Sequence, residues 1–447
     1  MISSTHPPPT GADDGSASRG DGEPVDDGPI SPRSSGPGTD RAPGGRRAGP
    51  PPGAFWRYGF PVLLGLLILA IPVLVVVGAR VVLDSNDGRL VNRVTDPDAP
   101  GWEAVLDPTP TELVLTVDAE GDLESVAVLV LSGEGSGAVL QVPAETLVDM
   151  GPDVGEVSIA FGWFANGVDG ARDMTGRLLN LAFTDTRVLT PQDWVSVVAP
   201  VAPLTVNSPD AAIGPDGLEA FPRGSIIVEA AEVPGYMSAT GPNEADVSRL
   251  VRVEALWRAW LSAVGVAGME AAPGSPEQGL GLFVGTLGAE QVRFVTLPVT
   301  DVGGDGAELY RAEPDDVARV VGELVPFPEG PPGARPTVRV LDGTGQLDHG
   351  VAAAIEIGVA GGQVRVIGNA EDFDVAATEV VYYDDAQREA AEAIRAALGV
   401  GEVIRSEQKS PVDVTVVLGA DALSVTNLAA APSTVPGVPL PQEEPGA

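Results

Sequence analysis

Cysteine is absent from the 447-residue sequence, so the chain has neither a disulfide framework nor a thiolate metal site. Histidine occurs only as His6 and His349, which excludes a histidine-centred catalytic triad and a histidine-rich metal site. Lys409 is the only lysine. A P-loop or Schiff-base mechanism would have to use that one residue, and its sequence context fits neither.

Positive charge is also scarce, because 26 Lys and Arg against 63 Asp and Glu give a formal net charge of −37. Residues 1–57 hold seven acids and six arginines, so nearly all of the excess negative charge lies further along the chain. Such a surface repels nucleic acid, and we expect no nucleic-acid partner. Solubility, or an acidic bias of the whole genome, is sufficient to explain the charge itself.

The chain has one long apolar run, Phe60–Leu83, whose only charge is Arg80. A hydrocarbon core of about 30 Å needs roughly 20 apolar helical residues, so we predict a single transmembrane helix over residues 58–83. A buried core helix and a cleaved signal peptide are the alternatives, but the run exceeds the usual signal-peptide length of about 7–15 residues. Four arginines shortly before the span favour a cytoplasmic N-terminus, so the domains that follow are expected outside the cell membrane.

Composition divides the rest of the chain. The first 57 residues are rich in Gly, Pro, Ser, Asp and Arg and cannot bury enough apolar surface to fold. The expected parts are a disordered cytoplasmic tail at 1–57, the membrane helix at 58–83, a tether at 84–108, a first domain at 109–328, a linker at 329–335, a second domain at 336–421 and a disordered tail at 422–447.

The first domain reads as mixed α/β. Strand-like segments punctuated by Gly and Asp are expected at 113–117, 126–131, 138–142, 226–228 and 292–297. Helices are expected at 174–182, 245–264 and 315–324, and the second of these has an apolar stripe at 3–4 spacing. The run 159–164 contains Phe161, Trp163 and Phe164 and is expected to be a core cluster, although Trp163 and Phe164 could instead line a lipid groove.

The second domain has the order β-α-β-β-α-β, which predicts a small α/β layer that folds alone. Its strands are expected at 338–341, 364–367, 379–383 and 414–418. Asp348 is expected to cap the first helix, which runs to Val359, and Asp384 to cap the second, with Gln387 completing a capping box.

This second domain resembles the C-terminal domain of LytR–CpsA–Psr cell-envelope proteins over about residues 335–421. The matching stretches are VRVLDGTGQLDHGVAAAI, TEVVYYDD, AAEAIRAAL and VDVTVVLGADAL, in that order. The loop of Gly343, Gly345 and Gly350 could be read as a phosphate cradle before a helix. Asp342 and Asp348 flank the loop and would repel phosphate, so a simple strand-to-helix turn is the better interpretation.

The first domain resembles a diverged LytR–CpsA–Psr (LCP) catalytic domain over about residues 109–328. Family members have an Asp-Thr pair and a Pro-Arg-Asp-Thr turn, where this chain has Glu124-Ser125 and Pro143-Ala144-Glu145-Thr146. The family's helix with acidic and arginine positions is matched by ADVSRLVRVEALWRAWL, which contains Arg249 and Arg252, and its last segments by FVTLPV and AELYRAEPDDVARVVGEL.

The family resemblance implies transfer of glycopolymers from a polyprenyl-pyrophosphate carrier to peptidoglycan, outside the membrane. It implies Arg249 and Arg252 as diphosphate ligands and Glu124 and Glu145 as holders of Mg²⁺, if the site is functional. Ordinary surface ion pairs for the arginines, and solvated turn positions for the two glutamates, are the alternatives. Ala144 replaces the arginine of the turn motif, and the expected arginine pair before the long helix is missing, so no residue is assigned as catalytic.

The leading hypothesis is therefore a membrane-anchored, extracytoplasmic cell-envelope protein with a degenerate LCP-like domain. It would bind envelope polymer such as peptidoglycan, a polyprenyl-linked glycopolymer carrier or a protein partner without turnover. The sequence thus favours a binding protein over an enzyme. An active Mg²⁺-dependent glycopolymer phosphotransferase is the first alternative. A LytR-type transcriptional attenuator is the second, and the acidic charge argues against it.

Overall fold

The computed structural model describes residues 94–133, 135–214, 217–241, 244–304, 308–425 and 428, together with two short strands, β1 (Ser85–Asn86) and β2 (Arg89–Leu90). These residues all belong to one compact unit, Gly78–Ala447. The expected N-terminal tail and membrane helix, and most of the expected C-terminal tail, lie outside the described residues. Within the described ranges, no helix combines the length and apolarity that a membrane crossing requires.

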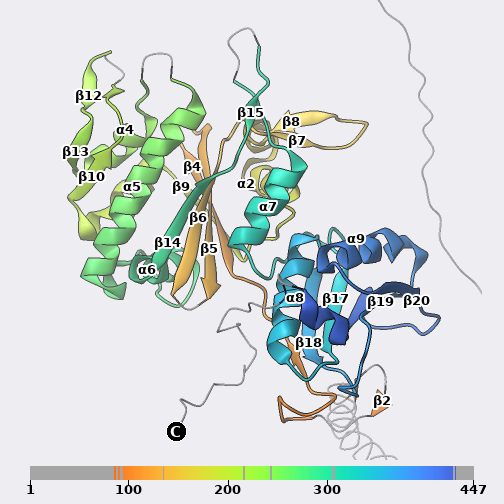
Figure 1. The fold of residues 1–447 in the computed structure, drawn as a ribbon. Coiled ribbons are helices and arrows are strands. Elements are labelled where there is room, and N and C mark those ends of the chain that lie inside the picture. The colour runs from red at the N-terminus through yellow and green to blue at the C-terminus, as the bar shows by residue number, and fades with distance from the viewer. Residues whose placement is uncertain are drawn as a thin grey trace, which may run out of the picture. The chain divides into compact units, whose positions relative to one another are not determined.

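A five-stranded mixed sheet forms the centre of the first domain, in the order β14-β6-β5-β4-β9 (Figure 1). β4, β5 and β6 are antiparallel neighbours, whereas β9 runs parallel to β4 and β14 parallel to β6. The strands are β4 (Thr111–Val117), β5 (Leu123–Gly133), β6 (Ser136–Val142), β9 (Asp185–Leu189) and β14 (Gln291–Thr296). The expected strands at 113–117, 126–131, 138–142 and 292–297 are confirmed, apart from Leu297, which follows β14.

Helices cover both faces of this sheet, which is why its central strands are apolar on both sides (Figure 1). One face carries α3 (Pro191–Val198), α5 (Asp246–Ala267) and α6 (Gly279–Ala289). The other carries α2 (Ile159–Leu179) and α7 (Pro314–Leu324). The helices expected at 245–264 and 315–324 are confirmed. The helix expected at 174–182 is confirmed only over 174–179, the last part of α2, because Asn180 is the C-cap of that helix.

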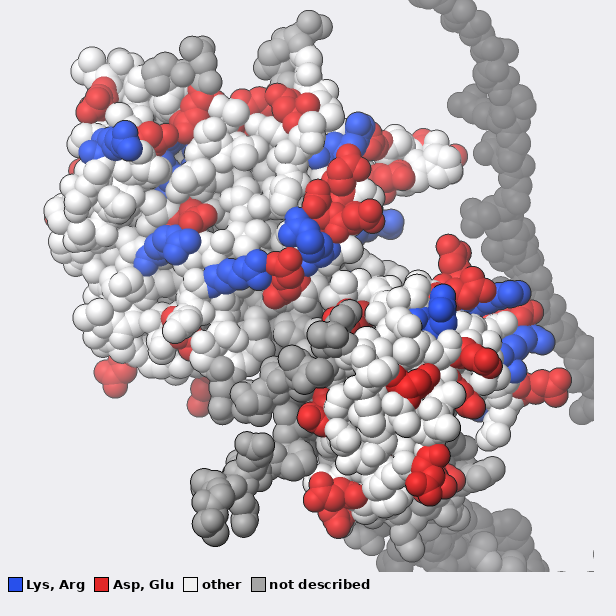
Figure 2. Space-filling view, in the orientation of Figure 1, with Lys and Arg blue, Asp and Glu red and all other residues white. Residues whose placement is uncertain are grey.

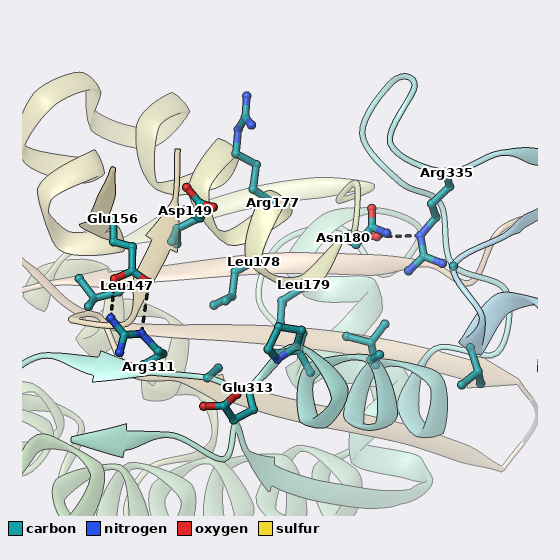
Figure 3. Close-up of a pocket in the computed structure, with 18 of the residues that line it drawn as sticks. Leu147, Asp149, Glu156, Arg177, Leu178, Leu179, Asn180, Arg311, Glu313 and Arg335 are labelled. Carbon is teal, nitrogen blue, oxygen red and sulfur yellow. Dashed lines mark hydrogen bonds and ion pairs between the residues drawn. The ribbon is translucent and has the colours of Figure 1, made fainter. Parts of the chain in front are cut away.

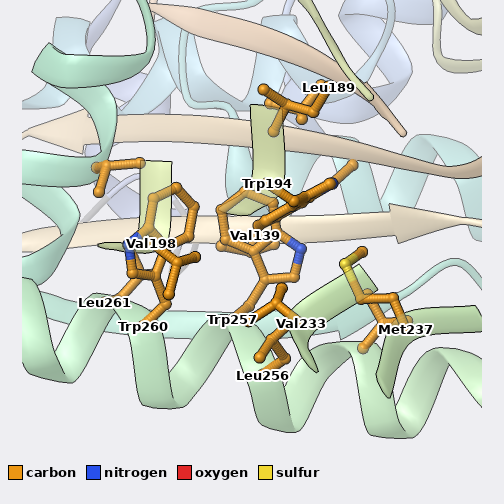
Figure 4. Close-up of a cluster of buried hydrophobic side chains, with 14 of the residues drawn as sticks. Val139, Leu189, Trp194, Val198, Val233, Met237, Leu256, Trp257, Trp260 and Leu261 are labelled. Carbon is orange, nitrogen blue, oxygen red and sulfur yellow. The ribbon is translucent and has the colours of Figure 1, made fainter. Parts of the chain in front are cut away.

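Three tryptophans form the centre of the core under α5 (Figure 4). The Trp194 ring meets Trp257 edge-on, with centroids 5.4 Å apart, and Trp260 at 5.5 Å. Trp194 also donates from Nε1 to the Thr116 hydroxyl at 3.2 Å, so its polar atom is satisfied inside the core. Trp257 and Trp260 belong to the apolar stripe that the sequence predicts.

The prediction of a core cluster at residues 159–164 is wrong for its two phenylalanines. This segment begins α2, with Ser158 as the N-cap, and helical periodicity turns Phe161 (53% exposed) and Phe164 (80% exposed) outward. Trp163 lies between these extremes and donates from Nε1 to the Gly121 carbonyl at 2.9 Å. Only Ile159 and Gly162 of this run are buried.

Shorter elements surround the first sheet. They are the hairpin β7 (Leu147–Asp149) and β8 (Glu156–Ser158), the pair β10 (Leu204–Ser208) and β13 (Gly224–Val228), the pair β11 (Ala212–Ile213) and β12 (Glu219–Phe221), the pair β15 (Thr300–Asp301) and β16 (Tyr310–Arg311), and the short helix α4 (Val233–Ser238). β13 confirms the strand expected at 226–228.

A six-stranded mixed sheet in the order β20-β19-β21-β17-β18-β3 forms the second domain. It contains the predicted β-α-β-β-α-β order and two further strands, one of which, β3, precedes the first domain in the chain. The elements are β3 (Glu103–Val105), β17 (Thr337–Asp342), α8 (Leu347–Val359), β18 (Gln363–Asn369), β19 (Glu379–Tyr382), α9 (Arg388–Leu398), β20 (Glu402–Arg405) and β21 (Val414–Leu418).

Both predicted helix caps of this domain are wrong. Asp348 lies in the first turn of α8, after the N-cap residue Gln346. Asp384 accepts from the Ala386 amide and caps a 3₁₀ turn, Asp385–Gln387, so α9 begins only at Arg388 and the capping box does not form. An aspartate side chain can accept from a backbone amide at the start of a 3₁₀ turn as well as at the start of an α-helix. The sequence pattern therefore does not distinguish the two.

Candidate functional site

The candidate site lies at one edge of the five-stranded sheet. The register places the carboxyl ends of β4, β6, β9 and β14 and the beginning of β5 at this edge. Glu124 is in β5, Glu145 follows the end of β6, and the N-terminus of α5 supplies Arg249. Ligands of open α/β sheets bind outside the carboxyl ends of parallel strands, so this edge is the natural place for a site.

Arg249 is buried and connects α5 to β5. Its guanidinium donates to Asp246 Oδ1 at 2.6 Å and 2.9 Å, to the Met237 carbonyl at 3.0 Å and to the Glu124 carbonyl at 2.6 Å. Glu124 Oε1 lies 3.5 Å from Nη1. The structure therefore brings Arg249 and Glu124 together, as the family resemblance implies. The two side chains form an ion pair with each other.

Arg252 is fully buried one turn further along α5. Its Nη1 donates to Asp210 Oδ1 at 3.0 Å and to Glu244 Oε1 at 2.6 Å, and its Nη2 donates to Glu244 Oε2 and the Ala239 carbonyl, both at 2.6 Å. Burial alone would lower the pKa of Arg252, but the hydrogen bonds to Glu244 and Asp210 raise it above its usual value. This guanidinium is thus a permanent cation held by two carboxylates.

Glu244 occupies the guanidinium fork in the way an anionic ligand would. Both of its oxygens accept from Arg252, and Oε2 also accepts from the Gly241 amide. Burial by itself would raise the pKa of Glu244, but the hydrogen bonds from Arg252 and Gly241 outweigh it and hold the pKa below its ordinary value. A bidentate carboxylate with a third donor is the arrangement that arginine sites use to bind carboxylate or phosphate.

The two proposed metal ligands have different surroundings. Burial raises the pKa of Glu124, and Arg249 offsets part of that rise. Glu145 is half-buried, and its carbonyl accepts from the Tyr310 amide at 3.0 Å. In the part of the chain that the structure describes, no three or more His, Asp or Glu side chains are grouped so that they could hold a metal ion.

The remaining positions of the family motifs contribute no charge to the site. Ala144 is buried where the family has an arginine. Tyr236 lies in the segment where the family's arginine pair is expected, and its hydroxyl donates to the Ser208 hydroxyl at 3.1 Å inside the core. Burial raises the pKa of Tyr236, so its hydroxyl stays neutral.

Sequence reasoning missed Asp210 and Glu244, the two acids that hold Arg252. They lie 42 and 8 residues before Arg252 in the chain, in segments with no recognisable motif. The sequence alternative of ordinary surface ion pairs is right about pairing for Arg249 and Arg252, but both guanidinium groups are buried and not at the surface. The surface follows the same pattern, since blue groups on the face shown in Figure 2 mostly adjoin red ones. Examples are Arg258–Glu254, Arg293–Glu323 and Arg319–Asp316.

The glycine loop of the second domain is a strand-to-helix turn stabilised by its own aspartate. Asp342 is fully buried and accepts from the Thr344 amide at 3.1 Å, the Thr344 hydroxyl at 2.7 Å and the Gln346 amide at 2.6 Å. These amides are the donors that a phosphate cradle would need. The loop is therefore filled internally, in agreement with the simpler of the two interpretations.

A cavity of about 530 Å³ lies between the end of α2, α7 and the C-terminal end of α8 (Figure 3). Arg335 in its wall is 7% exposed and donates to the carbonyls of Asn180, Gly358 and Gly362. Burial lowers the pKa of Arg335 to about 10. The three carbonyls lie at the C-terminal ends of α2 and α8, whose dipoles favour a cation, so Arg335 has a structural role.

Comparison with known proteins supports the family resemblance of the second domain. Residues 335–421 match the family model described as LytR cell envelope-related transcriptional attenuator. The predicted resemblance of this domain is thereby confirmed, and we call it the LytR C-terminal domain. No curated protein matches the chain.

Solved structures of LCP proteins are similar to the chain over about half of its length. TagT of Bacillus subtilis has 16% sequence identity and a TM-score of 0.40, covering 52% of this chain and 92% of TagT. TagV of the same species has 13% identity and a TM-score of 0.40, covering 48% and 96%. One TagT structure, with 14% identity, a TM-score of 0.39 and coverage of 52% and 92%, contains bound octaprenyl pyrophosphate lipid.

Proposed function

We propose that this protein is a single-pass cell-envelope protein whose LCP-like domain binds envelope polymer, a lipid-linked carrier or a protein partner without catalytic turnover. The proposed membrane helix at 58–83 anchors it, with the N-terminus in the cytoplasm and both domains outside. The LytR C-terminal domain supports the envelope assignment. The acidic charge disfavours the transcriptional attenuator, since a surface of net charge −37 repels nucleic acid.

One observation supports the absence of turnover: the carboxylate of Glu244 occupies the fork of Arg252. Phosphoryl transfer depends on positive charge that is free to stabilise the transferred group. Here two guanidinium groups, Arg249 and Arg252, face the carboxylates of Glu124, Asp210, Glu244 and Asp246. A diphosphate entering this site would have to displace the Glu244 carboxylate, which accepts two hydrogen bonds from Arg252.

The active phosphotransferase remains the alternative proposal, and the binding of octaprenyl pyrophosphate by TagT favours it. For this chain it would require Glu244 and Asp210 to leave Arg252, and Glu124 and Glu145 to take up Mg²⁺. Two carboxylates with waters are a workable Mg²⁺ site, because this ion usually keeps several waters. The two proposals therefore differ in whether the arginines can be freed.

Titration with inorganic pyrophosphate separates them. The native full-length protein in detergent should bind pyrophosphate only weakly, and Glu244→Gln should bind it at least 10-fold more tightly. The reason is that the variant loses a charged competitor worth about 1.5–3 kcal/mol, which is a factor of about 10–150 in affinity.

Calorimetric titration is the measurement, and Glu254→Gln is the matched control because Glu254 pairs with the exposed Arg258 on the same helix. The control should behave like the native protein. Tight pyrophosphate binding by the native protein, abolished by Arg252→Met, would overturn the proposal and favour the active enzyme.

A further inference from the structure

Residues 94–107, which we call the strap, precede the first domain in the chain but pack on the LytR C-terminal domain. Within the strap, β3 pairs antiparallel with β18, with Val105 opposite Val366 and Glu103 opposite Gly368. Hydrogen bonds extend the pairing at both ends, from the Leu106 amide to the Arg365 carbonyl (3.0 Å) and from the Asn369 amide to the Trp102 carbonyl (2.8 Å). The strap thus supplies the edge strand of this sheet.

The strap side chains alternate between the domain and solvent. Trp102 (5% exposed) and Leu106 (2% exposed) enter the hydrophobic cluster of the LytR C-terminal domain, whereas Val105 between them is 70% exposed. Glu103 forms an ion pair with Arg339 on β17. Trp102 thus packs in this second domain and not in the first domain, which directly follows it in the sequence.

The β18 edge has two features that allow the backbone of the strap to pack closely against it. The side-chain amide of Asn369 donates to the carbonyls of Pro97 (2.7 Å) and Ala99 (3.0 Å), so it holds the strap before β3 begins. Gly368 leaves room for the strap, because a Cβ at this position would lie 2.2 Å from the Trp102 carbonyl oxygen. A residue larger than glycine would therefore push the strap away.

We propose that the LytR C-terminal domain is a strand-acceptor module whose β18 edge binds an extended polypeptide, and that the chain's own strap is its resident ligand. Main-chain hydrogen bonds provide affinity and alternate side chains in pockets provide specificity, as in other domains that bind peptides by strand addition. The ligand class is an extended segment with an aromatic anchor and an aliphatic anchor four residues later, as Trp102 and Leu106 are.

The strap contributes two buried side chains, Trp102 and Leu106, to the hydrophobic cluster of this domain. A fragment of residues 336–421 alone would lack Trp102 and Leu106 and should be less stable than the same sheet with its strap.

A disulfide can test the pairing directly, because the chain has no cysteine of its own. Val105 and Val366 face each other at a position between the hydrogen-bonded pairs, where side chains on antiparallel strands are closest. In the full-length protein, Val105→Cys with Val366→Cys should form an intramolecular disulfide on mild oxidation, detected by mass spectrometry. Val105→Cys with Val302→Cys is the control, since Val302 is exposed on the first domain and should not react.

Gly368→Ala tests the acceptor edge. It should reduce the yield of the Val105–Val366 disulfide and raise the rate of chymotrypsin cleavage after Trp102 at least 10-fold. Gly235→Ala should change neither, because a Cβ there meets nothing within 4 Å. Absence of the disulfide in the unmodified background, or equal effects of the two glycine variants, would overturn the proposal. Cross-linked dimers would show that the occupant is the strap of a second copy, which would overturn the intramolecular assignment.

Discussion

Arg252→Met should lower the free energy of unfolding by about 3–5 kcal/mol, one of the largest effects expected of any single substitution in this chain. Breaking a buried ion pair by removing one partner leaves the other charge without compensation. Arg252 is fully buried, and its loss would leave Glu244, whose side chain is 7% exposed, without its bidentate partner. Urea unfolding of the full-length protein, followed by tryptophan fluorescence, measures the effect.

Arg258→Met is the matched control on the same helix. Arg258 pairs with Glu254 on the surface, where such pairs are worth about 0–1 kcal/mol. The double variant Arg252→Met with Glu244→Gln should recover part of the lost stability, because the buried carboxylate of Glu244 is then replaced by a neutral amide. Equal destabilisation by Arg252→Met and Arg258→Met would show that the buried network is not formed in solution.

Glu112→Gln should stabilise the protein at alkaline pH and leave its stability unchanged at pH 4. Glu112 is fully buried on β4, and neither of its oxygens has a hydrogen-bond partner among the described residues. Burial raises its pKa from 4.5 to about 7, with Asp185 on β9 adding to the rise and Arg187 opposing it. The folded protein therefore binds this proton more tightly than the unfolded chain does.

The sign of the pH dependence follows from that difference. The stabilisation by the bound proton is complete below about pH 4.5 and is lost as the pH rises through about 7, a change of roughly 3 kcal/mol. Glu112→Gln removes the ionisation, so its advantage over the native protein should grow between pH 5 and 8 and then level off. Thermal unfolding at four pH values measures this. Glu120→Gln, at an exposed turn, is the control, and identical pH profiles for native protein and Glu112→Gln would refute the assignment.

The sequence predicts well those elements whose pattern depends on local chemistry. The strands β4, β5 and β6 and the helix α5 are found where they are expected. Helices cover both faces of the sheet, so these strands are continuous apolar runs that can be recognised in the sequence. The prediction fails at residues 159–164, where the aromatic composition suggests burial. Composition does not decide which face a helix turns to the core, and Phe161 and Phe164 face outward.

Long-range pairing is the part that the sequence could not provide. The pattern that marked residues 84–108 as a polar tether gives no indication that Glu103–Val105 joins a sheet formed some 260 residues later. In the candidate site, the family resemblance placed Glu124 and Arg249 together, but nothing in the sequence pointed to Asp210 and Glu244. These acids come from loops, and their role depends on how the chain folds back over α5.

The central claim is that the arginines of the LCP-like site are held by the protein's own carboxylates and do not support turnover. The most direct test incubates the full-length protein in detergent with a polyprenyl-diphosphate-linked glycan and Mg²⁺, and measures release of the polyprenyl product by chromatography. We predict no release above a reaction without protein, for the native chain and for Arg252→Met alike. Mg²⁺-dependent release by the native protein that is lost in Arg252→Met would contradict the claim and establish an active phosphotransferase.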